Sequence, residues 1–165
     1  MILSRSGEYG LQIVLHLAAE GQTGYVTVRE LAGQLGIPFH FLGKICQRLT
    51  RQGVLVSYKG PNGGVAMAIA PDRITLLEVV KAIDGLAGWD RCVLGLDRCT
   101  GELPCPLHKP WRALKERILG MLSSKTVAQL ARELSLGKTT LRQVLDARAE
   151  VDNRSVTGDQ PQPTR

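Results

Sequence analysis

The fold is decided by residues 27–52, which read TVRELAGQLGIPFHFLGKICQRLTRQ. Thr27 can cap a helix by accepting a hydrogen bond from the amide three residues on, and Glu30 stands at the reciprocal position of a capping box. Gly36 marks the end of that helix, and Pro38 suits the start of the next because its missing amide donor is not needed there. Helix, glycine turn and helix together predict a helix-turn-helix.

Apolar spacing gives both helices an inner face. The expected inner residues are Val28, Leu31, Ala32 and Leu35 in the first helix and Leu42, Ile45, Cys46 and Leu49 in the second, which we expect over 39 to about 52. Two β-rich runs, 54–58 and 65–69, then flank the glycine-rich residues 59–64, which predicts a β-hairpin. A hairpin after a recognition helix is the wing of a winged helix. The expected fold class is therefore mainly α with a small β-hairpin wing.

Charge favours an anionic partner for this unit. The chain has a net charge of +6, and no carboxylate occurs between Leu31 and Pro71. One-signed charge of this kind suits a phosphate-facing surface, although a merely solvated basic face is the alternative. The residues that we expect to contact DNA are Thr27, Arg29, Pro38, Phe39, His40, Lys44, Gln47, Arg48, Arg51, Lys59 and Asn62. A nucleotide-binding loop at the wing is excluded because no Lys-Ser/Thr pair follows the glycines and no helix starts there.

Further helices are expected outside this unit. The apolar spacing predicts one over residues 4–20 and another over 75–84, which Gly85 ends. A long helix starts at Pro110 and Trp111, and its apolar stripe consists of Trp111, Leu114, Ile118, Met121 and Leu122. A stripe of that length has to face either this domain's core or the equivalent helix of a partner.

A short helix is expected over residues 127–134. Residues 126–134 repeat the pattern of 27–35, and residues 137–141 could open a second recognition-like helix. Because amphipathic helices often share such a stripe by chance, we expect a helical extension of the long helix rather than a second helix-turn-helix. The polar, proline-containing composition near the end predicts a disordered tail over 146–165.

Three of the four cysteines lie in one loop with a histidine. Cys92, Cys99, Cys105 and His108 have the spacing Cys-x6-Cys-x5-Cys-x2-His. Iron–sulfur clusters accept such wide spacing because a cluster is gripped from different sides of a loop, whereas structural zinc sites use tighter pairs. We therefore expect an iron–sulfur cluster, either 2Fe–2S or 4Fe–4S. Zinc and bare redox thiols remain the alternatives.

Composition and motifs also exclude some classes of protein. A chain of 165 residues can bury the core of one domain. It has no apolar run of membrane-spanning length and no signal-peptide hydrophobic region at its start, so we expect a cytoplasmic protein without membrane contact. No set of nucleophile, base and orienting group can be identified, so we expect no enzyme. A small electron carrier would leave the winged helix unexplained.

Several stretches together form a specific signature. They are Gly7–Leu11 at the start, Phe41–Ile45 in the recognition helix, Lys59–Gly64 in the wing, Leu76–Gly85, the three loop cysteines and His108–Trp111. With them, residues 1 to about 135 resemble the Rrf-two family of bacterial winged-helix transcriptional regulators, of the type that binds iron–sulfur clusters.

The resemblance implies a homodimer that binds a pseudo-palindromic operator in double-stranded DNA, with a cluster in each subunit held by the three cysteines. The fourth ligand varies in the family, and the candidates here are His108, which we favour, and Glu8 of the partner subunit. The chain departs from the family at Gly43, where many members carry a glutamate in the recognition helix. The operator sequence therefore cannot be carried over from relatives.

These observations lead to one functional hypothesis and one alternative. We expect a repressor whose operator affinity is controlled by a cluster that senses iron, redox state or nitric oxide. The alternative is a regulator of the same fold that has no cluster and responds by cysteine thiol oxidation or a small ligand. The expected organisation is a DNA-binding domain over 1–85, a cysteine-rich loop over 86–109, a dimerisation helix with its helical extension over 110–145, and the tail.

Overall fold

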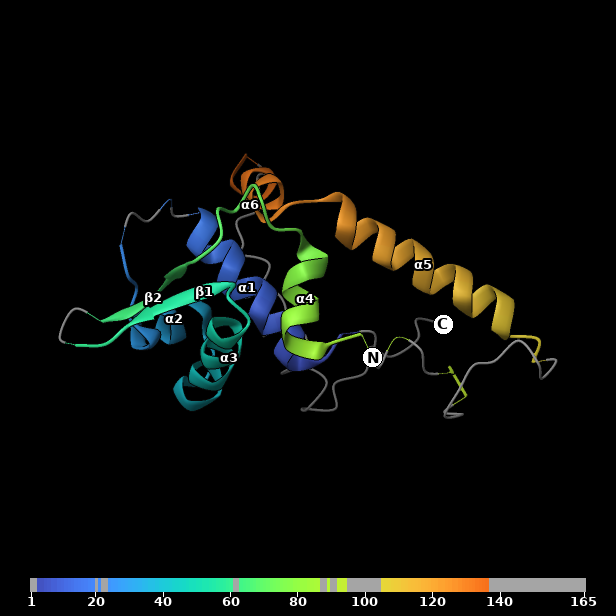
Figure 1. The fold of residues 1–165 in the computed structure, drawn as a ribbon, viewed down its shortest axis with the longest axis horizontal. Coiled ribbons are helices and arrows are strands. Elements are labelled where there is room, and N and C mark those ends of the chain that lie inside the picture. Colours follow the sequence, from blue (N-terminus) through green and yellow to red (C-terminus); the bar gives the residue numbers. More distant parts are fainter. Residues whose placement is uncertain are drawn as a thin grey trace, which may run out of the picture.

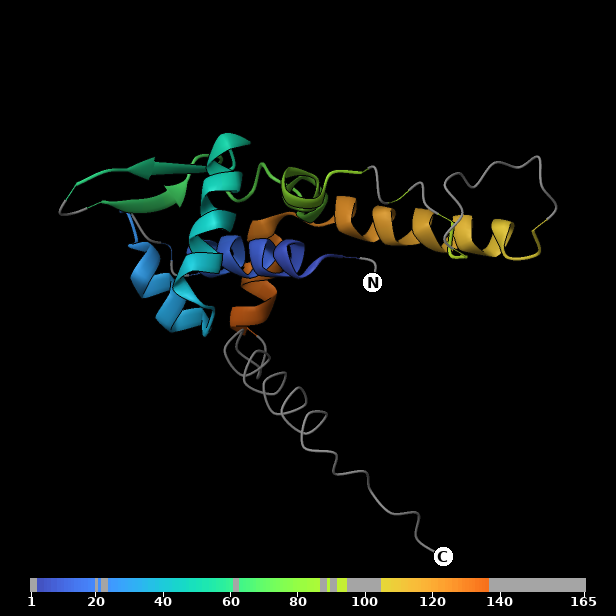
Figure 2. The same cartoon turned by 90° about the horizontal axis from the view of Figure 1, so that it is seen from below.

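The computed structural model describes residues 3–19, 21, 24–60, 63–86, 89, 92–94 and 105–136. The elements, in chain order, are α1 (Arg5–Ala19), α2 (Val28–Leu35), α3 (Phe39–Arg51), β1 (Leu55–Tyr58), β2 (Gly64–Met67), α4 (Leu76–Asp84), α5 (His108–Ser124) and α6 (Val127–Leu136). The helices and strands other than α5 pack around one core, and we call this unit the winged-helix body. Helix α5 projects away from it (Figures 1 and 2). The predicted fold class, helical with a two-stranded wing, is confirmed.

The helix boundaries follow from local hydrogen bonds that the sequence predicts. The Thr27 hydroxyl accepts from the Glu30 amide at 3.1 Å, and the Glu30 carboxylate accepts from the Thr27 amide at 3.0 Å. The same capping box starts α4 with Thr75 and Glu78. These hydrogen bonds lower the pKa of both glutamates, because they favour the charged carboxylate. Gly36 ends α2 in the left-handed conformation, with φ of 64°, as a helix stop requires.

The wing has a third segment beside its two strands. β1 and β2 pair antiparallel, with Leu55 opposite Met67. On the other side of β2, Val26 and Val65 exchange backbone hydrogen bonds of 2.9 and 2.8 Å. A Cβ at Gly64 would lie 2.3 Å from the Val26 carbonyl oxygen, so only glycine permits this approach. The segment before α2 therefore holds the wing against the body, which the sequence pattern did not predict.

The core of the body draws on every helix. Its buried members include Ile13, Val14, Leu17, Leu31, Leu35, Leu42, Ile45, Leu49, Leu55, Val65, Val79, Val80, Ile83, Leu122, Val127 and Ala131. The predicted inner faces of α2 and α3 are confirmed except at Val28, which is half-buried at the first turn of α2. None of the described helices is both long and apolar enough to cross a membrane.

The contact between α1 and α4 depends on two glycines of α1. A Cβ at Gly10 would lie 1.9 Å from Cδ1 of Ile83, and a Cβ at Gly7 would lie 2.5 Å from a carboxylate oxygen of Asp84. The Asp84 carboxylate accepts from the Ser4 amide at 2.9 Å and from the Ser4 hydroxyl, which itself accepts from the Gly7 amide at 3.0 Å. The start of α1 is thereby attached to the end of α4.

Helix α5 begins at His108, two residues earlier than predicted, and most of it is solvent-exposed. Of its predicted stripe, only Leu122 is buried, while Leu114 is 45 % and Met121 60 % exposed. Lys115 reaches back from α5 and donates to the Trp89 carbonyl at 2.6 Å. Trp89, which follows α4, is thereby attached to α5.

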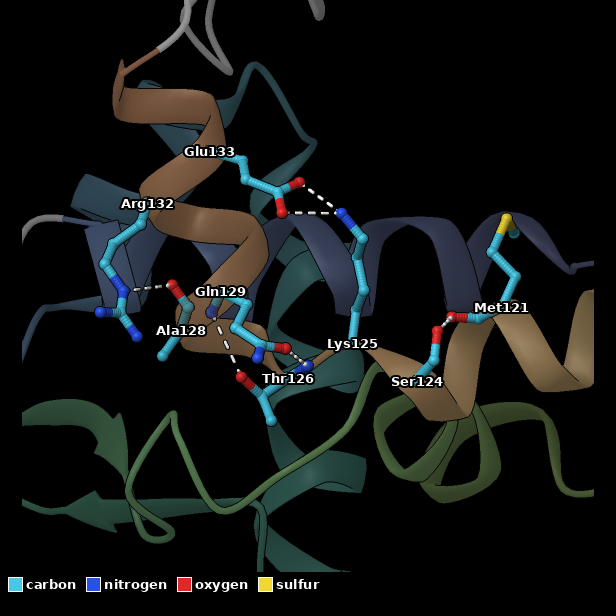
Figure 3. Close-up of polar contacts among 8 residues, drawn as sticks. All are labelled: Met121, Ser124, Lys125, Thr126, Ala128, Gln129, Arg132 and Glu133. Atoms are coloured by element: carbon cyan, nitrogen blue, oxygen red, sulfur yellow. Dashed lines mark hydrogen bonds and ion pairs between the residues drawn. The ribbon is translucent and has the colours of Figure 1, made fainter.

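The junction between α5 and α6 is attached to the start of α4. The Leu76 amide donates to the Lys125 carbonyl at 3.1 Å, and the Val127 amide donates to the Ile74 carbonyl at 2.9 Å. Figure 3 shows this junction, where Lys125 also pairs with Glu133 of α6. From there α6 turns back and packs against α1 in the core. The sequence interpretation of α6 as an extension of the long helix did not include this packing.

Some predictions lie outside the described residues. They are the recognition-like segment 137–141 of the second helix-turn-helix alternative, the rest of the helical extension to residue 145, and the tail.

Candidate DNA-binding groove and cysteine loop

A groove of about 760 Å³ lies between α3, the start of α2 and the wing. Its lining includes most of the residues that the sequence nominates for DNA contact: Thr27, Arg29, Phe39, His40, Lys44, Gln47, Arg51 and Lys59. Pro38 caps the start of α3 and Arg48 is exposed on α3, and neither is among the lining residues. Asn62 lies outside the described residues. The groove thus brings together side chains from three separate elements.

Helix α3 separates its core face from its groove face. Leu42, Ile45 and Leu49 are buried in the body, whereas Lys44 and Gln47 are exposed on the other side. This separation follows from the 3.6-residue period, which places polar residues opposite the apolar stripe. A side chain on the exposed face of α3 can therefore reach a ligand without disturbing the core.

The lining has a single sign of charge. Arg29, Lys44, Arg51 and Lys59 contribute to it, and no described residue of the lining is acidic. The guanidinium of Arg29 lies 5.3 Å from the centre of the Phe39 ring, a cation–π contact that holds this charge at the start of α3. A polyanion such as the DNA backbone is the ligand that such a groove suits.

Sequence reasoning missed several residues of this lining. Ser57 and Tyr58 of β1 line the groove, as does Thr50 of α3, whose hydroxyl is buried without a hydrogen-bond partner among the described residues. The only signal for Tyr58 was its position directly before Lys59. Gly43 also lines the groove, and a Cβ there would lie 3.9 Å from Val28. Packing therefore does not require glycine at position 43.

The fourth cysteine, Cys46, is buried on α3, where it also borders the groove. Its side chain is buried, and burial raises the pKa of its thiol to about 11. A thiol in that state stays protonated near neutral pH and is a poor nucleophile or metal ligand. Cys46 therefore belongs to the core cluster, which does not include Cys92 of the loop.

The cysteine loop is described only in part. Cys92 is buried, and its sulfur accepts a hydrogen bond from the Leu94 amide at 3.4 Å. Cys105 is half-buried, and its carbonyl accepts from the amide of His108, the first residue of α5, at 3.0 Å. Cys99 lies outside the described residues, and the described part of the chain alone assembles no group of three metal-ligating side chains. The alternative ligand, Glu8, lies in the first turn of α1.

Comparisons with known proteins agree with this arrangement. The Rrf2 family, described as iron-dependent transcriptional regulators, matches residues 3–133. The HTH-type transcriptional regulator IscR of Xenorhabdus nematophila is 31 % identical over 166 residues, covering 99 % of this chain and 96 % of the relative. The IscR of Serratia proteamaculans is 30 % identical over 154 residues, covering 93 % of each chain.

Solved structures show the same fold. CymR, the global cysteine regulator of B. subtilis, has a TM-score of 0.65 at 24 % identity, covering 79 % of this chain and 96 % of CymR. The IscR of T. potens has a TM-score of 0.63 at 22 % identity, covering 79 % of this chain and 86 % of that protein. The resemblance noted from the sequence is confirmed, and this chain belongs to the Rrf2 family of transcriptional regulators.

Proposed function

We propose that this transcriptional regulator is a homodimeric repressor that binds operator DNA through the groove of each winged-helix body. In this proposal, an iron–sulfur cluster on the cysteine loop controls the affinity for DNA. The observation that carries the proposal is the groove itself, in which four cations and no described carboxylate line the space between α3 and the wing.

DNA binding follows from the placement of the groove residues. In a helix-turn-helix the second helix enters the major groove, so the exposed residues His40, Lys44 and Gln47 of α3 would meet base edges. Arg51 and Lys59 would contact phosphates on either side. Phosphate contacts fix the register of a protein on DNA, whereas base contacts provide its specificity. Gly43 presents no side chain to the bases, so specificity in this protein relies on its neighbours.

The loop residues fit an iron–sulfur cluster chemically. Thiolates are the usual ligands of such clusters, and backbone N–H groups that donate to the ligating sulfurs are a feature of their surroundings. Cys92 offers such surroundings, since its sulfur is buried and accepts from the Leu94 amide. Cys99 and Cys105 would complete the thiolate set, with His108 or Glu8 of the partner subunit as fourth ligand. When bound, a cluster would supply a group that changes with iron supply, oxidation or nitric oxide.

Hydrogen bonds connect the cysteine loop, through α5 and α4, to the winged-helix body that carries the groove. Lys115 attaches the start of the loop to α5 through the Trp89 carbonyl. The far end of α5 is attached to the start of α4 by the backbone hydrogen bonds around Lys125. The end of α4 holds the start of α1 through Asp84. A loop that is ordered differently would thus shift α5 relative to both bodies of the dimer, and so the spacing of the two recognition helices.

The groove is tested by salt-dependent DNA binding. The probe is a duplex selected from a random library by the unmodified protein. Lys44→Gln and Arg51→Gln should each weaken binding, because the first removes a base contact and the second a phosphate contact. Arg51→Gln should also lower the slope of log affinity against log salt by about one. Lys81→Gln is the matched control, since Lys81 is exposed on α4 and does not line the groove. Unchanged affinity in both groove variants would refute this interface.

The cluster is tested by anaerobic purification. The expected result is a visible chromophore and a difference in DNA affinity between the protein as purified and the protein stripped of iron. Cys99→Ala should lose both the chromophore and the difference, while Cys46→Ala, the matched control, should keep them because Cys46 lies in the core of the body. A colourless protein with the same affinity in both forms would contradict the proposal.

A second candidate is regulation by thiol oxidation without a cluster. It is favoured by Cys105, which is only half-buried and so partly accessible to an oxidant. In that case mild oxidation of the iron-free protein, reversible by a dithiol, would change its DNA affinity. The chromophore distinguishes the two candidates directly.

A further inference from the structure

Two tyrosines form an exposed pair on the wing. The Tyr25 and Tyr58 ring centres lie 5.5 Å apart with the planes tilted by 33°. Tyr25 is 44 % and Tyr58 60 % exposed. Aromatic side chains of this size usually contribute to a core or an interface, so an exposed, mutually supported pair points to an interaction surface.

Strand geometry places the pair on the outer face of the wing. Successive residues of a strand point to opposite faces. The buried residues Leu55 and Val65 therefore mark the inner face, toward the helices, and Tyr58 lies on the outer face. Tyr25 precedes Val26, which is buried and pairs with Val65, so Tyr25 is on the outer face as well.

The wing is built so that the two rings can meet. They come from segments on opposite sides of β2, because Tyr58 pairs with Gly64 and Val26 pairs with Val65. The outer-face residues of β2 between them are Gly64 and Ala66, which have no bulky side chain to separate the rings. The glycine required by the close approach of Val26 thus also makes room for the aromatic pair.

We propose that the outer face formed by Tyr25 and Tyr58 binds the sugar–phosphate backbone of one DNA strand when the wing enters the minor groove. This inference rests on the proposed DNA-binding groove and extends it to the other side of the wing. The minor groove is only about 6 Å wide and is bordered by both backbones. A wing inside it therefore has one strand next to its inner face and α3, and the other strand next to its outer face.

The chemistry of the pair fits this ligand. Tyrosine hydroxyls donate to phosphate oxygens, and the rings pack against the apolar edges of deoxyribose. Tyr58 also lines the groove and directly precedes Lys59, so the outer face is continuous with the cationic lining. No carboxylate lies on β1 or β2 to repel a phosphate. The ring contact fixes both side chains before binding, which lowers the entropy cost of ordering them.

The test removes the hydroxyls and keeps the rings. Tyr25→Phe and Tyr58→Phe should each weaken binding to the selected duplex about fivefold, the usual effect of one hydrogen bond. The salt slope should not change, because a neutral hydroxyl releases no counterion, whereas Lys59→Gln should lower that slope by about one. Thermal stability should stay the same because the rings still touch.

Tyr9→Phe is the matched control, since Tyr9 is the only other tyrosine and packs against Phe41. It should leave DNA affinity unchanged. Equal affinity in the Tyr25→Phe, Tyr58→Phe and unmodified proteins overturns this inference alone, provided that Lys44→Gln and Arg51→Gln still weaken binding. If Tyr25→Ala and Tyr58→Ala abolish repression but not DNA binding, the face binds another protein and the inference is also overturned. If Lys44→Gln and Arg51→Gln also leave the DNA affinity unchanged, the proposed DNA-binding groove is refuted as well.

Discussion

The winged-helix body and helix α5 differ in how far their apolar stripes are buried. Each carries an apolar stripe that has to be removed from water. In the body these stripes meet one another, and Ile83 is fully buried against α1. In α5 the stripe leaves Leu114 and Met121 exposed, although the helix is the longest in the described chain. The body therefore buries its stripes within one chain, whereas the stripe of α5 stays partly exposed in the described part of the chain.

The comparison predicts different kinds of stability for the two regions. The free energy of unfolding of the body should not depend on protein concentration, because its contacts are made within the chain. The order of α5 should depend on concentration, because its partner is a second copy in our proposal. Substitutions of single residues separate these two kinds of stability.

The largest effect is expected at the contact between α1 and α4. Ile83→Ala removes a fully buried side chain and should lower the free energy of unfolding by about 3 kcal/mol, measured by urea denaturation. Gly10→Ala should also destabilise, by about 1–2 kcal/mol, because its Cβ would meet Cδ1 of Ile83. In an Ile83→Val background, which lacks that atom, the cost of Gly10→Ala should fall. An equal cost in both backgrounds would show that another atom limits this contact.

The next effect separates the cysteine of the body from those of the loop. Burial raises the pKa of Cys46 from 9.0 to about 11, which lowers its thiolate fraction near neutral pH about a hundredfold. In the iron-free protein, iodoacetamide at about pH 8 should therefore alkylate Cys105 long before Cys46. Mass spectrometry of tryptic peptides gives both rates. As the pH rises toward the pKa of Cys46, its rate should increase, and a fast reaction of Cys46 at neutral pH would contradict its burial.

A smaller effect is expected on the exposed stripe of α5. Leu114→Gln should weaken the dimer by about tenfold or more, as for an apolar side chain of this size buried in an interface. It should leave the unfolding of the winged-helix body within the chain nearly unchanged. Arg112→Gln is the control, because Arg112 lies on the side of α5 opposite the stripe and its ion pair with Glu116 is solvent-exposed. Sedimentation equilibrium measures the dimer affinity of both variants. A Leu114→Gln variant that dimerises normally would place the interface elsewhere.

The body and α5 also differ in what the sequence could predict. The capping box of Thr27–Glu30, the stop at Gly36 and the inner face of α3 all depend on residues within one or two turns. Such local patterns determine element boundaries, and the structure confirms them. The Val26–Val65 pairing depends instead on segments far apart in sequence. Nothing in the local pattern of Val26 indicates a strand neighbour.

The same limit applies to the groove and to α6. Periodicity assigns Arg48 and Arg51 to the outer side of α3, yet only Arg51 lines the groove, because position relative to the wing depends on tertiary structure. The apolar stripe of α6 shows that it packs against something, but not that its partner is α1. The cysteine ligand set also stays a prediction, since Cys99 lies outside the described residues.

The smallest effect is expected from lowering the pH, which should weaken a capping box that contains a glutamate but not one that contains a glutamine. Hydrogen bonds from Thr75 lower the pKa of Glu78 in the folded protein, so its contribution is present above the unfolded value of 4.5 and is lost as the pH falls through the lowered folded pKa. Glu78→Gln should keep the cap but remove this acid sensitivity.

The capping box of helix α6 has a neutral glutamine, so a charge can be added there by the opposite substitution. The Thr126 amide donates to the Gln129 side chain at 2.9 Å, and the Gln129 amide donates to the Thr126 hydroxyl at 3.2 Å (Figure 3). Gln129→Glu should stabilise the protein by a few tenths of a kcal/mol at about pH 7, since a carboxylate favours a helix start, and the gain should vanish at about pH 3. Denaturant midpoints at the two pH values measure the change. A gain that persists in acid would mean that hydrogen-bond geometry, and not charge, stabilises the start of α6.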